Sequence, residues 1–172
     1  GCNTSFSHNI PCPSPISVTP DSIVDVSCFG LSDGEIYISV SGGTPSTNNG
    51  YNFSWNGNTF ISEDLIGISA GSYSVEVTDS NLCLGTFSAI NINEPALLEA
   101  NVLSVIDASC YDALDGGIEI RVDGGTAPFT ASVYDNGFNL LYDTVFSSLS
   151  VICPVPGAGL YDIIVNDANG CQ

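Results

Sequence analysis

An internal repeat constrains this chain more than any other feature of its sequence. Cys28, followed by Asp-Gly and Gly-Gly-Thr sequences, has its counterpart in Cys110, which lies 82 residues further on and is followed by the same landmarks. An Ala-Gly-x-Tyr sequence ending at Tyr73 returns 88 residues later at Tyr161. Since a unit of this length is the size of a small domain, the chain is expected to hold tandem domains rather than one large one.

The boundaries follow from the repeat. We expect a first repeat over residues 16–95 and a second over 96–172 that lacks its last strand. Residues 1–15 are expected to hold the last strand of a preceding repeat and a linker, because Cys2 and the residues after it resemble the stretch that begins at Cys83. The second copy carries a net insertion of six residues, which we place in a loop over 149–159.

Apolar residues alternate with polar ones, which is the period of a strand with one buried face. Ile36, Ile38 and Val40 form one such series, and Tyr51, Phe53 and Trp55 form another. Asp-Gly, Gly-Gly and Asn-Gly pairs between the series are turn signals. The fold class is therefore predicted to be all-β, with tandem immunoglobulin-like antiparallel β-sandwich repeats. Tyr73 and Tyr161 each follow a Gly at the start of a strand, as in the tyrosine corner of such sandwiches.

The charge balance excludes several classes of function. The chain has 19 acidic residues against one cation, Arg121, and a formal net charge of −18. Phosphate contacts need clustered Lys and Arg, so we expect no nucleic-acid partner and no attraction to an anionic membrane. No run of about 20 apolar residues is present, so membrane insertion is not expected either. His8 has no partner for acid–base work, and the acidic residues are scattered, so we predict that the protein is not an enzyme.

Seven cysteines without a Cys-x-x-Cys pair favour disulfides in an oxidising, extracellular setting over zinc. Each copy carries one Cys before its second strand and one at the turn into its last strand. We predict pairing within each copy, with Cys83–Cys110 as the rival, and a partner for Cys2 in an upstream segment. A bond between Cys12 and Cys153, within one chain or between units, is a further hypothesis. The predicted pairs are Cys28–Cys83 and Cys110–Cys171.

Calcium is the one cofactor that the sequence leaves open. Four aspartates stand at turn positions, and hard oxygen ligands in turns suit Ca²⁺. Aspartates in turns more often bond their own backbone, and no complete calcium-loop pattern is present. The four residues are Asp33, Asp79, Asp115 and Asp167.

The ordered landmarks resemble the SprB-type repeat of gliding and adhesin surface proteins in the Bacteroidota. In the first copy the resemblance rests on Cys28-Phe29-Gly30, Asp33-Gly34, Gly42-Gly43-Thr44-Pro45, Trp55, Ala70-Gly71-Ser72-Tyr73, Thr78-Asp79 and Cys83. The first copy departs from the family pattern at Leu82, where the family has Gly, and the second copy has Val133 where the family has Trp. The resemblance implies a secreted, surface-attached repeat protein that is exported by the type IX route and takes part in adhesion or gliding.

The function expected from these features is a non-catalytic extracellular stalk or filament whose partners are neighbouring repeats or identical subunits. One alternative is a carbohydrate- or ligand-binding module for surface glycans, with Trp55 in an exposed platform, although alternation favours the core for that residue. Another is a filament subunit joined to its neighbours by strand exchange. Ser22 and Thr144 follow Asp in a motif that resembles the O-glycan acceptor of the same bacteria.

Overall fold

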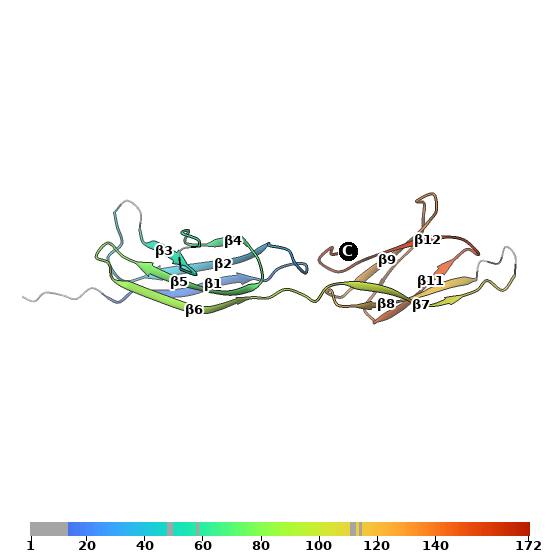
Figure 1. Cartoon of the computed structure of the whole chain (residues 1–172), viewed down its shortest axis with the longest axis horizontal. Coiled ribbons are helices and arrows are strands. Elements are labelled where there is room, and N and C mark those ends of the chain that lie inside the picture. Colours follow the sequence, from blue (N-terminus) through green and yellow to red (C-terminus); the bar gives the residue numbers. More distant parts are fainter. Residues whose placement is uncertain (1–13, 48–49, 58, 111–112, 114) are drawn as a thin grey trace, which may run out of the picture. The chain divides into compact units, whose positions relative to one another are not determined.

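The structure is a computed structural model that describes residues 14–47, 50–57, 59–110, 113 and 115–172. These residues form twelve strands, and every strand pairing among them is antiparallel. They separate into two compact units (Figure 1). The predicted all-β sandwich architecture is confirmed. No helix in the described part of the chain is long and apolar enough to cross a membrane.

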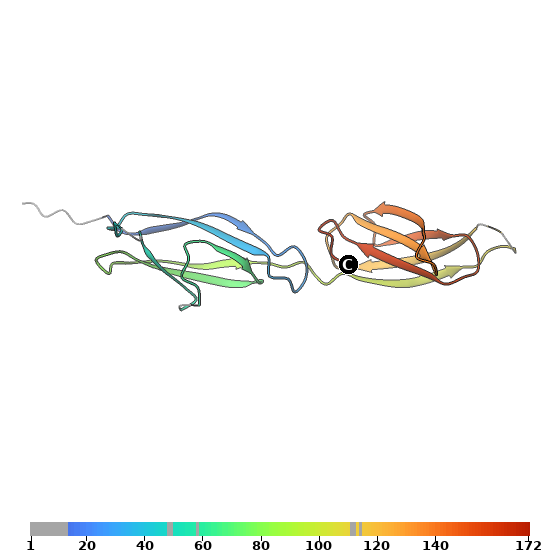
Figure 2. The same cartoon turned by 90° about the horizontal axis from the view of Figure 1, so that it is seen from above.

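Unit 1 consists of two three-stranded sheets. Its strands are β1 (Ser17–Val24), β2 (Gly34–Ser41), β3 (Asn52–Trp55), β4 (Leu65–Ile68), β5 (Gly71–Thr78) and β6 (Leu84–Ile92). One sheet has the order β1-β2-β4 and the other β3-β5-β6. Figure 1 labels these strands, and Figure 2 shows the same cartoon turned by 90°.

The alternation read from the sequence is the alternation of burial in unit 1. Ile36 and Ile38 of β2 are buried, while Glu35 and Tyr37 between them are half-buried. Trp55 of β3 is fully buried and pairs with Val75 of β5, which is fully buried too. The apolar faces of the two sheets thus supply one core, and burial of this apolar surface is the main force that holds the sandwich together.

Unit 2 has the same arrangement of strands with two differences. It gains one strand, and no described strand occupies the place that β6 has in unit 1. Its strands are β7 (Glu99–Ile106), β8 (Gly116–Asp123), β9 (Phe129–Asp135), β10 (Leu140–Phe146), β11 (Ser150–Val155) and β12 (Tyr161–Asn166). The sheets have the orders β11-β8-β7 and β10-β9-β12. Ile120, Val133 and Val165 belong to a core cluster drawn from both sheets. Strand β10, which pairs with β9, is the addition.

The loop predicted over 149–159 is largely wrong, because β11 occupies Ser150–Val155. Pro154 misled the prediction, since proline cannot donate to a β-ladder. β11 is an edge strand, however, and edge strands tolerate proline. Val151, Cys153 and Val155 stand at alternate positions, and this period of two was the sequence signal that could have identified the strand.

The second edge of β12 is unpaired among the described residues. In unit 1 the same edge of β5 carries β6, where Tyr73 pairs with Ile90 and Gly71 pairs with Ile92. In unit 2 the counterparts of Tyr73 and Gly71 line an open hollow of about 1090 Å³. Those counterparts are Tyr161 and Gly159.

Unit 2 is assembled from two separate stretches of the chain, Asp25–Asp33 and Asn93–Gln172. Unit 1 holds the residues up to Val24 together with Gly34–Ile92. The segment 25–33 leaves the end of β1 and returns into β2, yet it belongs to the other unit. The repeat boundaries predicted from the sequence did not anticipate that segment 25–33 belongs to unit 2.

Candidate functional site

The candidate site lies in unit 2, where the loop 25–33 meets the turn 167–171. An aspartate fixes the shape of the loop. The Asp33 carboxylate accepts hydrogen bonds from the Ser27 amide at 3.0 Å and from the Ser27 hydroxyl at 2.5 Å. The amide of Leu31 donates to the carbonyl of Cys28 at 3.1 Å, which closes a tight turn directly after the cysteine. The Ser27 hydroxyl, followed by its amide, holds the pKa of Asp33 below its usual value.

A second aspartate fixes the turn. Oδ1 of Asp167 accepts the amides of Asn169 at 2.8 Å and Cys171 at 2.9 Å, and Oδ2 accepts the amide of Thr126 at 2.9 Å. Asp167 is 6% exposed, and such a buried carboxylate is tolerated because its oxygens are hydrogen-bonded. The carboxylate therefore holds Cys171 at a defined place.

The Gly-Gly-Thr landmark provides the wall against which this aspartate packs. Gly125 has a φ of +60°, and a Cβ built on it would lie 2.8 Å from Leu98 and 3.3 Å from Oδ2 of Asp167. Any side chain there would strain the backbone and crowd the carboxylate. Gly43 in unit 1 has the same φ and the same relation to Asp79.

A disulfide joins the loop to the turn. The sulfurs of Cys28 and Cys171 are bonded, with their Cα atoms 5.7 Å apart. Beside the bond, the Asn169 side chain donates to the carbonyl of Ser27 at 2.8 Å. On the other side of the loop, the amide of Gly30 donates to the Glu94 carboxylate at 2.7 Å. The loop is thus held by the disulfide, by the hydrogen bond from Asn169 and by the hydrogen bond to Glu94, which follows β6.

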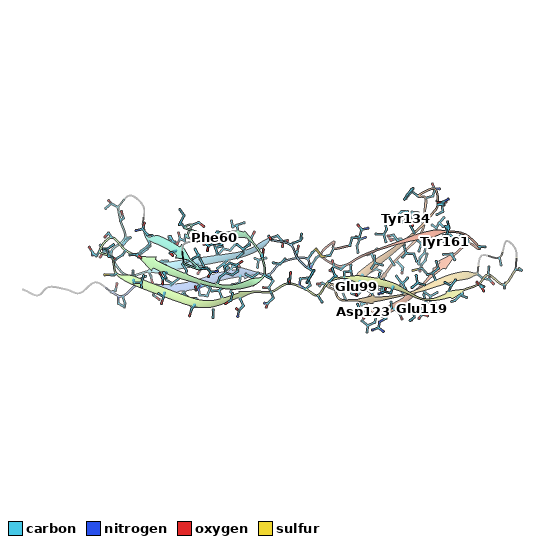
Figure 3. The ribbon with its side chains drawn as sticks, viewed as in Figure 1. Phe60, Glu99, Glu119, Asp123, Tyr134 and Tyr161 are labelled. Atoms are coloured by element: carbon cyan, nitrogen blue, oxygen red, sulfur yellow. A yellow bond between two sulfur atoms is a disulfide. The ribbon has the colours of Figure 1, made fainter. Side chains whose placement is uncertain are left out.

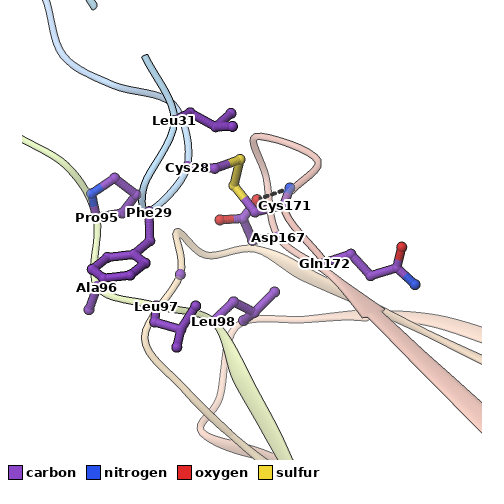
Figure 4. Close-up of a pocket in the computed structure, with 11 residues that line it drawn as sticks. Cys28, Phe29, Leu31, Pro95, Ala96, Leu97, Leu98, Asp167, Cys171 and Gln172 are labelled. Atoms are coloured by element: carbon purple, nitrogen blue, oxygen red, sulfur yellow. Dashed lines mark hydrogen bonds between the residues drawn. A yellow bond between two sulfur atoms is a disulfide. The ribbon is translucent and has the colours of Figure 1, made fainter. Parts of the chain in front are cut away.

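Two further contacts close this arrangement. The amide of Val26 donates to the carbonyl of Asn93 at 2.9 Å, and the amide of Asn93 donates to the Asp25 carboxylate at 2.8 Å. Phe29 and the disulfide border a small cavity of about 240 Å³ next to Pro95 (Figure 4). Sequence reasoning missed Asn93, Glu94 and Asn169 as supports of the loop. The contacts of Asn93 and Glu94 join opposite ends of the first repeat, and that of Asn169 crosses from the second repeat to the first, so the repeat pattern could not reveal them.

The predicted disulfide pairs are wrong. The structure contains neither Cys28–Cys83 nor Cys110–Cys171, and the rival pair Cys83–Cys110 is not formed either. The physical reason is that loop 25–33 belongs to unit 2, so its cysteine meets the turn of the second copy and not that of its own copy. Cys83 and Cys110 are exposed free thiols.

Of the three remaining cysteines, Cys153 alone lies within the described residues. Cys2 and Cys12 lie outside the described residues, so the suggested Cys12 bond has no structural account. Cys153 is a free thiol on β11, fully buried within the core cluster of unit 2. Burial raises the pKa of its thiol above the ordinary value, which keeps it protonated and unreactive.

The four candidate calcium ligands are not brought together. No group of three or more His, Cys, Asp or Glu side chains within the described ranges could hold a metal ion. Asp79 repeats the role of Asp167, and its oxygens accept the amides of Thr44 at 2.8 Å, Asn81 at 2.9 Å and Cys83 at 2.8 Å. Asp115 repeats the role of Asp33, with the Ser109 amide at 2.9 Å.

The electrostatics of these carboxylates follow from their donors. Burial raises the pKa of Asp79, but the amides of Cys83, Thr44 and Asn81 outweigh burial and leave that pKa below its ordinary value. The hydroxyl and amide of Ser109 lower the pKa of Asp115. Asp79 and Asp115 are therefore ionised hydrogen-bond acceptors that shape a turn and a loop.

The two candidate glycan acceptors lie on edge strands of their sheets. Ser22 on β1 is exposed, and Thr144 on β10 is half-buried. The aspartate before each one is tied to the neighbouring strand. Asp21 accepts the Ser39 hydroxyl at 2.5 Å, and Asp143 accepts the Ser132 hydroxyl at 2.7 Å. Ser22 is consequently the more accessible of the two hydroxyls.

The predicted roles of Trp55 and of the two corner tyrosines have different outcomes. Trp55 is a core residue, with no exposed surface and with its indole N–H donating to the carbonyl of Ser62 at 2.9 Å. Both tyrosine corners are confirmed, because the Tyr73 hydroxyl donates to the carbonyl of Ser69 at 2.8 Å and that of Tyr161 to Gly157 at 2.9 Å. Trp55 therefore offers no platform for a sugar ring.

Several acidic side chains lie on β7 and β8, two strands of the sheet β11-β8-β7. Glu99 and Asp123 are directly paired across the two strands, and Arg121 makes an ion pair with Asp123 at 3.0 Å. Figure 3 labels Glu99, Glu119 and Asp123 on these strands. This exposed ion pair adds little stability, since water screens both partners.

Comparison with known proteins identifies the repeat. The family model described as SprB repeat matches residues 21–60 and 103–138, one region in each copy. No curated protein and no solved structure gave a match. The matched regions start within β1 and β7 and include both cysteine-bearing loops.

Proposed function

This chain carries two SprB-type repeats, a class of extracellular repeat domain found in surface proteins, and on that premise we propose that it is a tension-bearing segment of an adhesin-type stalk. It has no catalytic task. The observation that carries the proposal is the Cys28–Cys171 bond, which joins two cysteines 143 positions apart in the sequence. Any pull along the chain passes from Cys28 directly to Cys171, so nearly all of both repeats is spared the load.

The surface composition supports an extracellular stalk. A net charge of −18 keeps such chains soluble and apart from each other, because like charges repel. A disulfide requires an oxidising setting, which the outside of a cell provides. Export by the type IX route and a part in gliding follow from the family resemblance and belong to the same proposal.

The test is to image the native protein by electron microscopy and to measure the mass of its intact polypeptide, with antibody labelling of unbroken cells alongside. The proposal expects surface-attached rods made of a chain many times longer than 172 residues. Compact monomers, or a protein confined to the cell interior, would contradict it.

The edge of β12 is unpaired among the described residues, and this observation favours a second candidate, assembly of subunits through an added strand. Ile90 and Ile92 of β6 are buried in unit 1, and the corresponding place in unit 2 is the hollow beside Tyr161. Ile118 lines this hollow and is half-buried, whereas its counterpart Ile36 is fully buried. An extended segment with the apolar pattern of β6 would complete the sheet by main-chain pairing.

A synthetic peptide with the sequence of Leu84–Ile92 tests this candidate. Calorimetric titration is expected to show saturable binding to the chain, and a control peptide carrying Asp in place of both Ile90 and Ile92 is expected not to bind. Equal behaviour of the two peptides would remove strand addition as a function of this edge. The outcome leaves the stalk proposal unaffected, because that proposal rests on the disulfide.

A further inference from the structure

Each repeat sequence supplies two cysteine-bearing elements, a loop and a turn, and the structure bonds only one loop to one turn. The loop of the first copy, with Cys28, is bonded to the turn of the second copy, with Cys171. The loop of the second copy, with Cys110, and the turn of the first copy, with Cys83, carry exposed free thiols. One bonded pair and two unbonded halves are therefore present in the same chain.

The unbonded turn has the geometry of the bonded one. The Asp79 carboxylate holds the amides of Asn81 and Cys83 at 2.9 and 2.8 Å, against 2.8 and 2.9 Å at Asp167. The amide of Asp79 donates to the carbonyl of Cys83 at 3.1 Å, and the same bond at Asp167 is 3.0 Å long. Cys83 is thus held as Cys171 is held, without its partner.

The surroundings of the turn are repeated as well. The amide of Ser80 donates to Thr44 at 3.1 Å, as Ala168 does to Thr126 at 2.9 Å. Asn81 occupies the position of Asn169, whose side chain holds the carbonyl of Ser27 in the bonded site. The turn that receives a loop in unit 2 accordingly has a described counterpart with the same hydrogen bonds in unit 1.

The unbonded loop is repeated in the same way. Asp115 accepts the amide of Ser109 as Asp33 accepts that of Ser27. The amide of Ala113 donates to the carbonyl of Cys110 at 3.1 Å, the distance found after Cys28. The described hydrogen bonds of both halves thus match those of the bonded pair, and the bonded pair shows what each half takes as its partner.

We propose that Cys83 and Cys110 are complementary halves of an inter-repeat disulfide, each of which bonds a neighbouring SprB-type unit. The loop of Cys110 docks on the turn of the next unit, and the turn of Cys83 receives the loop of the unit before it. Every repeat then gives its loop to the following unit, as the first repeat does here. The inference deepens the proposed stalk function, since a series of such bonds would carry load along an array.

The bond forms by thiol–disulfide exchange with a small disulfide such as oxidised glutathione. The Cys110 thiolate attacks one sulfur of the oxidant and displaces one glutathione thiolate, which leaves a mixed disulfide on the protein. The Cys83 thiolate of the second unit then attacks the Cys110 sulfur and displaces the second glutathione thiolate. Two protein thiols lose two protons and two electrons, and one oxidant disulfide becomes two thiols.

Two complementary variants of the chain test the inference. In a background of Cys2→Ser and Cys12→Ser, Cys83→Ser leaves only the loop half and Cys110→Ser leaves only the turn half. Each is incubated in a glutathione redox buffer, alone and as an equimolar mixture, and analysed on non-reducing gels and by mass spectrometry of linked peptides. Circular dichroism confirms that both variants are folded.

The expected result is a disulfide dimer in the mixture, at least ten times more abundant than in either variant alone, with Cys110 linked to Cys83. A control chain carrying Cys83→Ser, Cys110→Ser and Ser80→Cys displays an exposed thiol three residues away in the same turn and is expected to dimerise poorly in the mixture. Dimers of similar yield in one variant alone or with the control, no dimer in the mixture, or a Cys83–Cys110 bond inside a single unsubstituted chain would each overturn the inference. Because purified chains are used, such a failure is separate from a failure of the stalk function on cells.

Discussion

Removal of the Cys28–Cys171 bond should change how far the chain extends under force. The perturbation is Cys171→Ser, and the matched control is Cys83→Ser, which alters the equivalent turn but leaves the bond in place. Each chain is held by handles at its two ends and pulled in single-molecule force spectroscopy without reductant.

The magnitude follows from the sequence enclosed by the bond. A stretched chain spans at most about 3.5 Å per residue, so a bond between cysteines 143 positions apart hides about 500 Å of contour length. With the bond intact, only the residues before Cys28 and after Cys171 can be extended, which is about 100 Å. Cys171→Ser should extend to about 600 Å, and the Cys83→Ser control should behave as the unsubstituted chain.

The rival pairing gives a different length and can be told apart. Bonds at Cys28–Cys83 and Cys110–Cys171 would enclose loops of 55 and 61 residues and hide about 400 Å in total. A full extension of about 600 Å by the unsubstituted, unreduced chain would mean that no such bond exists. Either result would refute the load-sparing role assigned to Cys28 and Cys171.

The same bond has a thermodynamic effect. In the chain-entropy model, closing a loop of 143 residues stabilises the folded state by about 5 kcal/mol. Much of that stability should disappear from a urea unfolding curve when the bond is reduced. Unit 2 should lose the most, because the loop and the turn both belong to it.

Further predictions concern the supports of the fold. Tyr73→Phe and Tyr161→Phe should each cost about 1 kcal/mol in urea unfolding, since each removes a part-buried hydrogen bond from the hydroxyl to a loop carbonyl. Asp79→Asn should destabilise the chain at pH 6, and the destabilisation should shrink as the pH falls below 3.8. The pKa of Asp79 is lowered from 3.8 in the folded state, so its contribution is full above that value and disappears as the pH falls through the lower folded value. EDTA should leave Tm unchanged, because the oxygens of Asp79 and Asp167 are occupied by backbone amides. Leu82→Gly should raise stability by about 0.5 to 1 kcal/mol in thermal unfolding, because Leu82 has a φ of +65° and glycine adopts that conformation without strain.

Local patterns were sufficient to predict much of the fold. The alternation that includes Ile36 and Ile38 is a property of neighbouring residues, and the strand and its buried face are where that alternation placed them. The tyrosine corners are equally local, since the hydroxyl of Tyr73 reaches a carbonyl only four residues away. Such features are encoded within a few positions of each other.

The site could be predicted only in part, because its pairing is not local. The repeat shows which cysteines are equivalent, but pairing within a copy and pairing from one copy to the next satisfy the same spacing. What decides between them is that segment 25–33 belongs to unit 2, and nothing in its own sequence signals this. By contrast, the structure explains the glycine that the SprB-type repeat has at the position of Leu82. The φ of that position is positive, which favours glycine.

The central claim is that the loop of one repeat is bonded to the turn of the next. It is tested most directly by mass spectrometry of peptides from the native protein, digested without reduction. Proteases that cut at acidic or aromatic residues suit this chain, which has a single Arg and no Lys. The expected product is a linked peptide pair that contains Cys28 and Cys171. Linked pairs of Cys28 with Cys83 and of Cys110 with Cys171 would contradict it.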